Sequence, residues 1–312
     1  MAPERHIPSV LQNQCQQRAR TIIPVGPCQA AGIFDFSHVA GQFPALENFV
    51  ESVADWDVPD SKIARDLAIT IFPSTTPYLV VQYRVPMRSS RKFGDVILQH
   101  RQYQHVATMV RTGIVTIRPD GPLGAVIVRL RPETAACLLG DHMDEFGDVK
   151  IDLGAVFDAG EVSLLAEMLA ECRASHDRIV AVLRFLLANL RRFEPDRVVY
   201  RAVANLRNNP AFRVRLLAAE LGLSERHLSR KFRTVFGASP KQFARAARVE
   251  RIMEARGGGS AWADIAYSCG FADQAHMIND FRAIFGTTPD KVFRSLLVEQ
   301  YRDNMTATPS SP

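Results

Sequence analysis

The last hundred residues contain one pattern twice, and this repeat constrains the fold more than any other feature of the chain. The first copy reads Leu-Gly-Leu-Ser at 221–224 and Phe-Gly-Ala-Ser-Pro at 236–240. The second reads Cys-Gly-Phe-Ala at 269–272 and Phe-Gly-Thr-Thr-Pro at 285–289. Self-similarity at a period between about 20 and 50 residues indicates a repeated supersecondary unit.

Each copy has the features of a helix-turn-helix. Gly222 and Gly270 can adopt the positive φ that a sharp turn between two helices requires. Ser224 suits the N-cap of the next helix, because its hydroxyl can accept hydrogen bonds from the first-turn amides. An apolar stripe then anchors that helix on its partner. The stripe residues are Leu228, Phe232 and Phe236 in the first copy and Met277, Phe281 and Phe285 in the second.

The opposite faces of these two second helices differ in charge. The first is strongly basic and the second is almost uncharged, so we expect the first to contribute more of the DNA affinity. The predicted DNA-binding residues are Arg226, Ser229, Arg230 and Arg233 in the first copy and Gln274, Ala275, Asn279 and Arg282 in the second.

The segment between the copies predicts a rigid spacer. Residues 241–253 are strong helix formers without Gly or Pro, and the run of glycines at 257–259 reads as a turn before a capping Ser260. About sixteen helical residues at about 1.5 Å each span about 24 Å. With the width of the flanking helices, this approaches the separation of about 34 Å between successive major grooves. One chain could therefore contact two groove segments on one face of a duplex.

Positive charge is concentrated around the repeat. Residues 196–297 contain 17 Lys and Arg against 9 Asp and Glu, whereas residues 1–195 contain 20 against 22. A local basic footprint neutralises phosphates, which supplies the sequence-independent part of DNA affinity. A merely solvated basic surface is the alternative, and the tandem motif favours double-stranded DNA as the partner.

The repeat resembles the DNA-binding domain of the AraC/XylS class of bacterial transcription regulators over residues 214–293. The matching residues are Leu217, Ala218, Gly222, Leu223, Ser224, Leu228, Arg230, Lys231, Phe232, Phe236, Gly237, Ser239 and Pro240, then Arg248, Glu250, Arg251, Asp264, Ile265, Ala266, Cys269, Gly270, Phe271, Ala272, Asp273, Gln274, His276, Phe281, Arg282, Phe285, Gly286, Thr287, Thr288 and Pro289.

The resemblance implies base contacts from Arg226, Ser229 and Arg230 on the first recognition helix, and from positions around Gln274, Ala275 and Asn279 on the second. It also implies RNA polymerase, a small-molecule effector and a second copy of the chain as further candidate partners. Two positions depart from the family. Ala275 stands where Ser is common, and Asn279, followed by Asp280, stands where a basic residue is common. The second helix is therefore expected to bind weakly, or by amide and apolar contacts.

The first two-thirds of the chain reads as a β-rich module followed by helices, so the expected fold class is α+β with an all-α C-terminal domain. Strands are predicted at 67–72, 78–85, 95–100, 106–110, 113–118 and 124–130. They predict a small barrel or sandwich, in an order similar to the cupin-like sensor domains of this regulator class. Residues 43–56 have the pattern of a short helix, and the rest of 1–60 gives no assignment.

Helices are predicted at 132–139, 161–172 and 175–192, and the last has one apolar stripe. Its residues are Ile179, Leu183, Leu186, Leu187 and Leu190. Two interpretations stay open, packing on the chain's own core and a homodimer surface that would match paired operator sites. A linker near 193–196 divides the chain into a sensor or dimerisation domain at 1–195, a DNA-binding domain at 196–297 and a disordered tail at 298–312.

No enzyme chemistry is predicted. His100 and His105 are too few for a metal site, and no nucleophile motif or phosphate-binding glycine loop occurs, so neither a metal nor another cofactor is expected. Five separated cysteines argue for a reducing compartment, with a redox sensor as the alternative. No apolar run reaches 18 residues and no secretory segment opens the chain, so a cytoplasmic protein is expected.

These features predict a sequence-specific transcription regulator controlled by a ligand or by dimerisation. The alternative is an interaction protein whose N-terminal domain is the partner surface and whose DNA affinity is non-specific.

Overall fold

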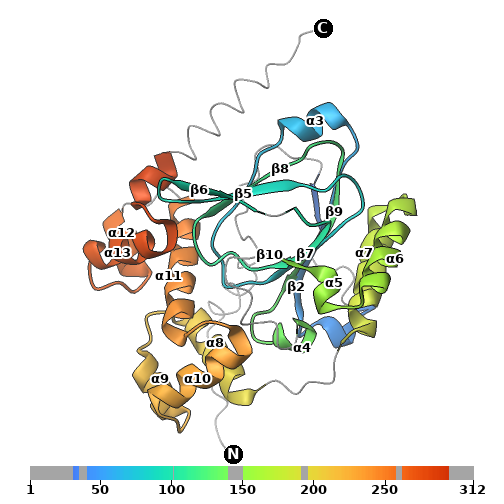
Figure 1. The fold of residues 1–312 in the computed structure, drawn as a ribbon. Coiled ribbons are helices and arrows are strands. Elements are labelled where there is room, and N and C mark those ends of the chain that lie inside the picture. The colour runs from blue at the N-terminus through green and yellow to red at the C-terminus, as the bar shows by residue number, and fades with distance from the viewer. Residues whose placement is uncertain are drawn as a thin grey trace, which may run out of the picture.

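The computed structural model describes residues 31–34, 41–100, 102–139, 150–190, 196–257 and 262–294. Within them a β-rich N-terminal part precedes a helical C-terminal part, as Figure 1 shows, and the expected fold class is confirmed. Residues 193–195 of the predicted linker, residues 258–260 of the predicted glycine turn and the predicted tail at 298–312 lie outside the described residues.

The N-terminal part contains two sheets in which every neighbouring pair of strands is antiparallel. The six-stranded sheet has the order β1 (Ala31–Phe34), β2 (Val50–Val58), β9 (Leu123–Leu130), β4 (Tyr78–Gln82), β7 (His105–Thr108) and β10 (Lys150–Asp152). The four-stranded sheet has the order β3 (Ile69–Ile71), β8 (Ile114–Arg118), β5 (Arg88–Phe93) and β6 (Val96–Gln99). Buried side chains from both sheets, such as Trp56 and Ile117, share one cluster, so the sheets face each other. Each of the six predicted strands overlaps an observed one.

The helix expected at 43–56 is wrong. A short 3₁₀ turn, η1 (Pro44–Leu46), is followed by β2, the strand that pairs with β9. Three of its five buried residues, Val50, Val53 and Trp56, are three apart, which imitates a helical stripe. The pairing shifts between Val50 and Ser52, because a bulge there breaks the two-residue alternation by which a strand is recognised. Strand β5 was not predicted, because its sequence Arg-Ser-Ser-Arg-Lys-Phe is mostly polar.

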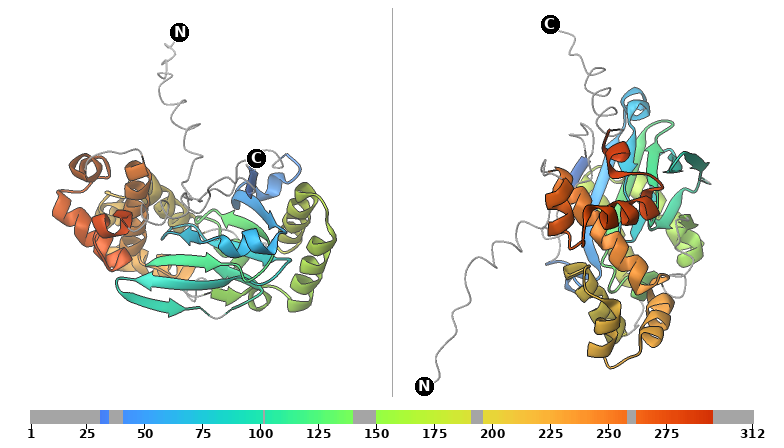
Figure 2. Two further views of the ribbon diagram at one scale, coloured as in Figure 1. Left: turned by 90° about the horizontal axis from the view of Figure 1, so that it is seen from above. Right: turned by 90° about the vertical axis from the view of Figure 1, so that its left-hand side faces the viewer.

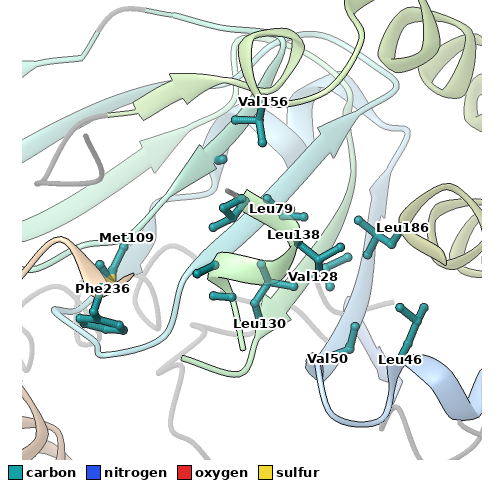
Figure 3. Close-up of a cluster of buried hydrophobic side chains, with 14 of the residues drawn as sticks. Leu46, Val50, Leu79, Met109, Val128, Leu130, Leu138, Val156, Leu186 and Phe236 are labelled. Atoms are coloured by element: carbon teal, nitrogen blue, oxygen red, sulfur yellow. The ribbon is translucent and has the colours of Figure 1, made fainter. Parts of the chain in front are cut away.

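Helices α6 (Ala159–Glu171) and α7 (Ser175–Ala188) follow the strands, with the shorter α3 (Ser61–Asp66), α4 (Ala136–Leu139) and α5 (Leu153–Val156) at earlier positions. Ile179, Leu183 and Leu186 of α7 are buried in the core, and Figure 3 shows Leu186 and Leu46 in the same part of this cluster. The core interpretation of the stripe is therefore confirmed for these three residues. Leu187 remains on the surface.

The C-terminal part consists of α8 (Arg197–Asn208), α9 (Val214–Glu220), α10 (Glu225–Phe236), α11 (Pro240–Gly257), α12 (Trp262–Ser268) and α13 (Gln274–Phe285). Helix α11 lies between the α9–α10 pair and the α12–α13 pair in the views of Figures 1 and 2. Phe243 near the start of α11 packs in the core that contains Phe232, whereas Ile252 near its end packs in the core that contains Phe281. One helix thus supplies buried side chains to both units.

The larger core continues from the six-stranded sheet into the first helix pair. Val128 and Met109 belong to the same buried cluster as Phe236, and Figure 3 shows Met109 beside Phe236. Apolar contact therefore crosses the boundary expected at residue 195.

Candidate nucleic-acid interface

The first helix pair has the turn and caps that its sequence predicts. Gly222 has a φ of +71°, in the left-handed region that favours glycine. The hydroxyl of Ser224 accepts a hydrogen bond from the backbone N–H of His227 at 3.2 Å and caps α10. Helix α10 ends at Gly237, whose φ of +67° gives a left-handed C-terminal cap.

The second pair repeats this geometry with one chemical change. Gly270 has a φ of +78°, and a Cβ there would lie 2.6 Å from the Cβ of Ala211. The cap of α13 is a carboxylate, because Asp273 accepts from the backbone N–H of His276 at 2.7 Å. Gly286 ends the helix with a φ of +71°. The two units therefore share the same helix-turn-helix geometry and differ in the residue that caps the second helix, Ser224 in one and Asp273 in the other.

The apolar stripes anchor α10 and α13 as predicted. Leu228, Phe232, Met277 and Phe281 have no exposed surface, and Phe281 stacks on Phe285 at 4.3 Å between ring centroids. Anchoring of this kind fixes which side of each helix faces outward.

The predicted DNA-binding residues lie on the outward faces of the two recognition helices. Seven of them are exposed and Ser229 is half-buried. The exposed residues are Arg226, Arg230, Arg233, Gln274, Ala275, Asn279 and Arg282. Within the described part of the chain, the three arginines of α10 form no ion pair, which leaves their charge available for phosphate or base edges. Their contacts with DNA remain predictions.

The side chain of Asp280 does not lie on the outward face of α13, although Asp280 follows the exposed Asn279 in the chain. It is buried on the side of α13 that faces α11, where it accepts hydrogen bonds from Nε of Arg245 and Nε of Arg248, both at 3.0 Å. Arg248 also donates to the backbone oxygen of Pro210 at 2.7 Å. This cluster fastens α13 to α11, and sequence reasoning missed it because the partners lie more than thirty residues apart.

A cavity of about 160 Å³ lies between the two sheets and reaches α11. Its wall is mainly apolar, with Trp56, Ile117 and Met109 from the N-terminal part and Met253 from α11. Lys150 also lines it, and burial lowers the pKa of this ammonium group to about 8. No carboxylate of the described residues pairs with Lys150. The cavity therefore offers a mainly apolar volume and one cation, Lys150, that pairs with no carboxylate of the described residues.

Two other ionic residues at the cavity are already paired. Arg207 of α8 contacts Glu51 at 3.1 Å and Glu133 at 3.3 Å. Arg129 lies over the ring of Tyr78 and 3.6 Å from Glu51. A further cation of the wall, Arg91, donates to the Thr112 hydroxyl at 3.1 Å. Among the described residues, Lys150 is therefore the cation of the wall best suited to a bound anion.

His105 and His100, the candidate metal ligands of the β-rich part, both contact protein groups. The Nδ1 atom of His105 accepts from the backbone N–H of Gln82 at 3.2 Å, and Nδ1 of His100 lies 3.1 Å from the Ser89 hydroxyl. Among the described residues no cluster of three or more His, Cys, Asp and Glu side chains could hold a metal ion. None of the described helices is long and apolar enough to cross a membrane.

Comparisons with known proteins agree with the geometry of the C-terminal part. A protein-family model described as "Helix-turn-helix domain" matches residues 217–295. No curated protein sequence matches the chain. The crystal structure of ToxT from Vibrio cholerae O395 aligns over 79% of this chain and 97% of that chain, at 11% identity and a TM-score of 0.41.

Unsaturated fatty acid bound ToxT from Vibrio cholerae strain SCE256 aligns over 77% of this chain and 93% of that chain, at 13% identity and a TM-score of 0.40. The AraC-like transcriptional activator CuxR covers 68% of this chain and 76% of its own, at 17% identity and a TM-score of 0.18. TM-scores this low do not establish a shared fold. The C-terminal domain is therefore identified from the family match and from its two glycine turns, its helix caps and its apolar stripes. The C-terminal part of this chain, over residues 217–295, is a helix-turn-helix DNA-binding domain of the AraC type.

Proposed function

We propose that the chain is a sequence-specific transcription regulator that reads two adjacent major-groove segments with α10 and α13. The observation that carries this proposal is the pair of outward faces, each anchored by a buried stripe and joined by one helix. Helix α11 has 18 residues, which corresponds to about 27 Å at about 1.5 Å per residue. Adding the recognition helices brings the two faces close to the groove spacing of about 34 Å.

The outward faces of α10 and α13 contribute differently to DNA binding. Arg226, Arg230 and Arg233 give α10 the charge for phosphate contacts and the guanidinium geometry for guanine edges. Gln274 and Asn279 of α13 suit adenine, and Ala275 suits a thymine methyl group. Affinity then comes mainly from α10, and α13 adds sequence preference.

Competition binding tests this function. The full-length chain is mixed with a duplex selected from a random pool, and unlabelled random duplex is added in excess. A specific regulator keeps most of its bound cognate duplex. Loss of nearly all of it supports the alternative, an interaction protein with non-specific DNA affinity. Arg226→Ala refines the result, because equal losses on cognate and random duplex identify a phosphate contact instead of a base contact.

We propose further that residues 1–195 sense a signal and that residues 196–297 bind DNA. The signal is a small, mostly apolar molecule with an anionic group, held in the cavity between the sheets with that group at Lys150. Support comes from the mainly apolar wall and from the ammonium group of Lys150, which pairs with no carboxylate of the described residues. ToxT, bound to an unsaturated fatty acid in one of its structures, provides a ligand of this chemistry for the first trial.

The effector proposal is tested with a matched pair of probes, a medium-chain fatty acid and the alcohol of the same chain length. Calorimetry on the full chain should give tighter binding of the acid, and Lys150→Met should remove the difference between the two. Equal binding of both probes to the unaltered chain would reject the role of Lys150. RNA polymerase and a second copy of the chain remain predicted partners.

A further inference from the structure

One loop of the N-terminal part contacts the ends of both recognition helices. This 109–113 loop joins β7 to β8 and contains Arg111 and Gly113. The Nη1 atom of Arg111 donates to the backbone oxygen of Gly237 at 2.9 Å, and its Nη2 donates to that of Phe236 at 3.1 Å. Both oxygens belong to the C-terminal end of α10, where a cation is favourable because the helix dipole is negative there.

The same loop reaches α13 two residues later. The backbone N–H of Gly113 donates to the oxygen of Ile284 at 2.7 Å. The neighbouring β5–β6 turn adds a second bond, from the N–H of Gly94 to the oxygen of Phe285 at 2.9 Å. Both oxygens lie in the last turn of α13. The loop therefore binds unsatisfied carbonyl groups at the same end of each recognition helix.

Glycines permit the close approach of these turns. Gly113 has a φ of +72°, and a Cβ there would lie 2.5 Å from the backbone oxygen of Lys92 within the N-terminal part. Across the boundary, a Cβ on Gly94 would lie 3.1 Å from the backbone oxygen of Gly286. A Cβ on Gly286 would lie 2.5 Å from the backbone nitrogen of Gly94. The backbones of the two parts are thus in direct contact, without side chains that could adapt between them.

The loop adds a second connection between the two units. The first connection is α11, whose two halves pack in different cores. A single connecting helix leaves the two units held by one element, whereas contacts from the N-terminal part to both units add a second restraint on their relative placement. Arg111 and Gly113 supply these contacts at the C-terminal ends of α10 and α13.

We infer that Arg111 and Gly113 are positioning residues that fix the separation of the two recognition helices and so select the spacing between the two half-sites on DNA. This inference rests on the proposed two-groove function. The two hydrogen bonds of Arg111 to α10 go to backbone oxygens at the end of that helix, so we expect Arg111 to act on spacing and to leave the base preference of each half-site intact. One base pair of extra spacing moves a half-site by about 3.4 Å along the duplex and turns it by about 35°.

The experiment selects duplexes from a random pool with the full-length chain and counts the base pairs between the two selected motifs. For the unaltered chain we expect one dominant separation, favoured at least about tenfold over its neighbours, a factor equal to about 1.4 kcal/mol. For Arg111→Ala we expect the preference to fall severalfold while each motif keeps its own consensus. Arg111→Lys, which retains a cationic donor, should restore part of the preference.

Arg131→Ala is the matched control, because Nε of Arg131 also donates to a backbone oxygen, that of Glu47 at 2.9 Å, but within the N-terminal part. Arg131→Ala should leave the spacing distribution unchanged.

Gly94→Ala is a second variant, for use if thermal melting shows that Arg111→Ala fails to fold. It disturbs the contact of the N-terminal part with α13 instead of the contact with α10. An unchanged distribution in folded Arg111→Ala overturns the inference. So does a uniform rise in affinity at all separations, which would make the contact autoinhibitory. If the unaltered chain selects no paired motifs, the two-groove function itself fails.

Discussion

Thr75 and Glu250 join the wall of the cavity to the helix that connects the two recognition units. The carboxylate of Glu250, on α11, accepts from the backbone N–H of Thr75 at 2.8 Å and from its hydroxyl at 2.9 Å. The preceding residue, Ser74, donates its N–H at 2.7 Å to the backbone oxygen of Val110, next to Arg111. One set of hydrogen bonds therefore links the segment beside the cavity, the 109–113 loop and the helix between the recognition units.

Glu250→Ala should destabilise the chain by about 1–3 kcal/mol, because the buried amide of Thr75 loses its acceptor. The free energy of unfolding in urea measures this change. Glu225→Ala is the control, since its carboxylate pairs with exposed Lys241 and, among the described residues, with no other cation, so its loss should cost less than about 1 kcal/mol. Equal effects of the two substitutions would mean that the Thr75 contact contributes nothing beyond a surface pair.

Phe232→Ala and Phe281→Ala should each destabilise their unit by about 3–5 kcal/mol, because both side chains are fully buried. Thermal melting should detect the loss, and DNA affinity should fall with it. Tyr267→Ala serves as the control, because that ring is 87% exposed in the same region. Unchanged melting together with lost binding would mean that the two phenylalanines touch DNA.

Lys150→Met should stabilise the chain most at low pH. Burial lowers the pKa of Lys150 to about 8, below its ordinary value near 10.5, so folding disfavours the charged form. The unfolded chain then binds more protons between about pH 8 and 10.5, and the stability of the unaltered chain rises across that interval. The gain from Lys150→Met is therefore full below about pH 8 and declines above it. Urea titrations of both proteins at several pH values measure the difference, and a gain that grows with pH would contradict the burial of a cation.

Local sequence signals predicted the helix-turn-helix units well. Turn glycines, a capping Ser224 and stripes of spacing four act within a few residues of one another, so one unit can be read without its surroundings. The two recognition faces followed from the same stripes, because burying one side of a helix exposes the other.

Features that depend on distant partners could not be predicted. The bulge in β2 takes its form from pairing with β9, and Asp280 is buried by arginines of another helix. Arg111 binds backbone oxygens 125 and 126 residues away, and backbone groups leave no mark in a sequence. The cavity likewise forms only where two sheets and α11 meet.

The unequal charge of α10 and α13 leads to a direct comparison of one substitution on each helix. Arg230→Ala removes a cation from an exposed position of α10, whereas Asn279→Ala removes a neutral amide from α13. On one operator, measured by fluorescence anisotropy, we expect Arg230→Ala to cost about 1–3 kcal/mol and Asn279→Ala to cost less. Asn279→Arg should raise affinity and steepen the dependence of log K on log salt by about one unit if the new cation reaches a phosphate.

Because Arg230 and Asn279 lie on outward faces, none of these three substitutions should alter the melting temperature. A larger loss from Asn279→Ala than from Arg230→Ala would reverse the assignment and make α13 the dominant recognition helix.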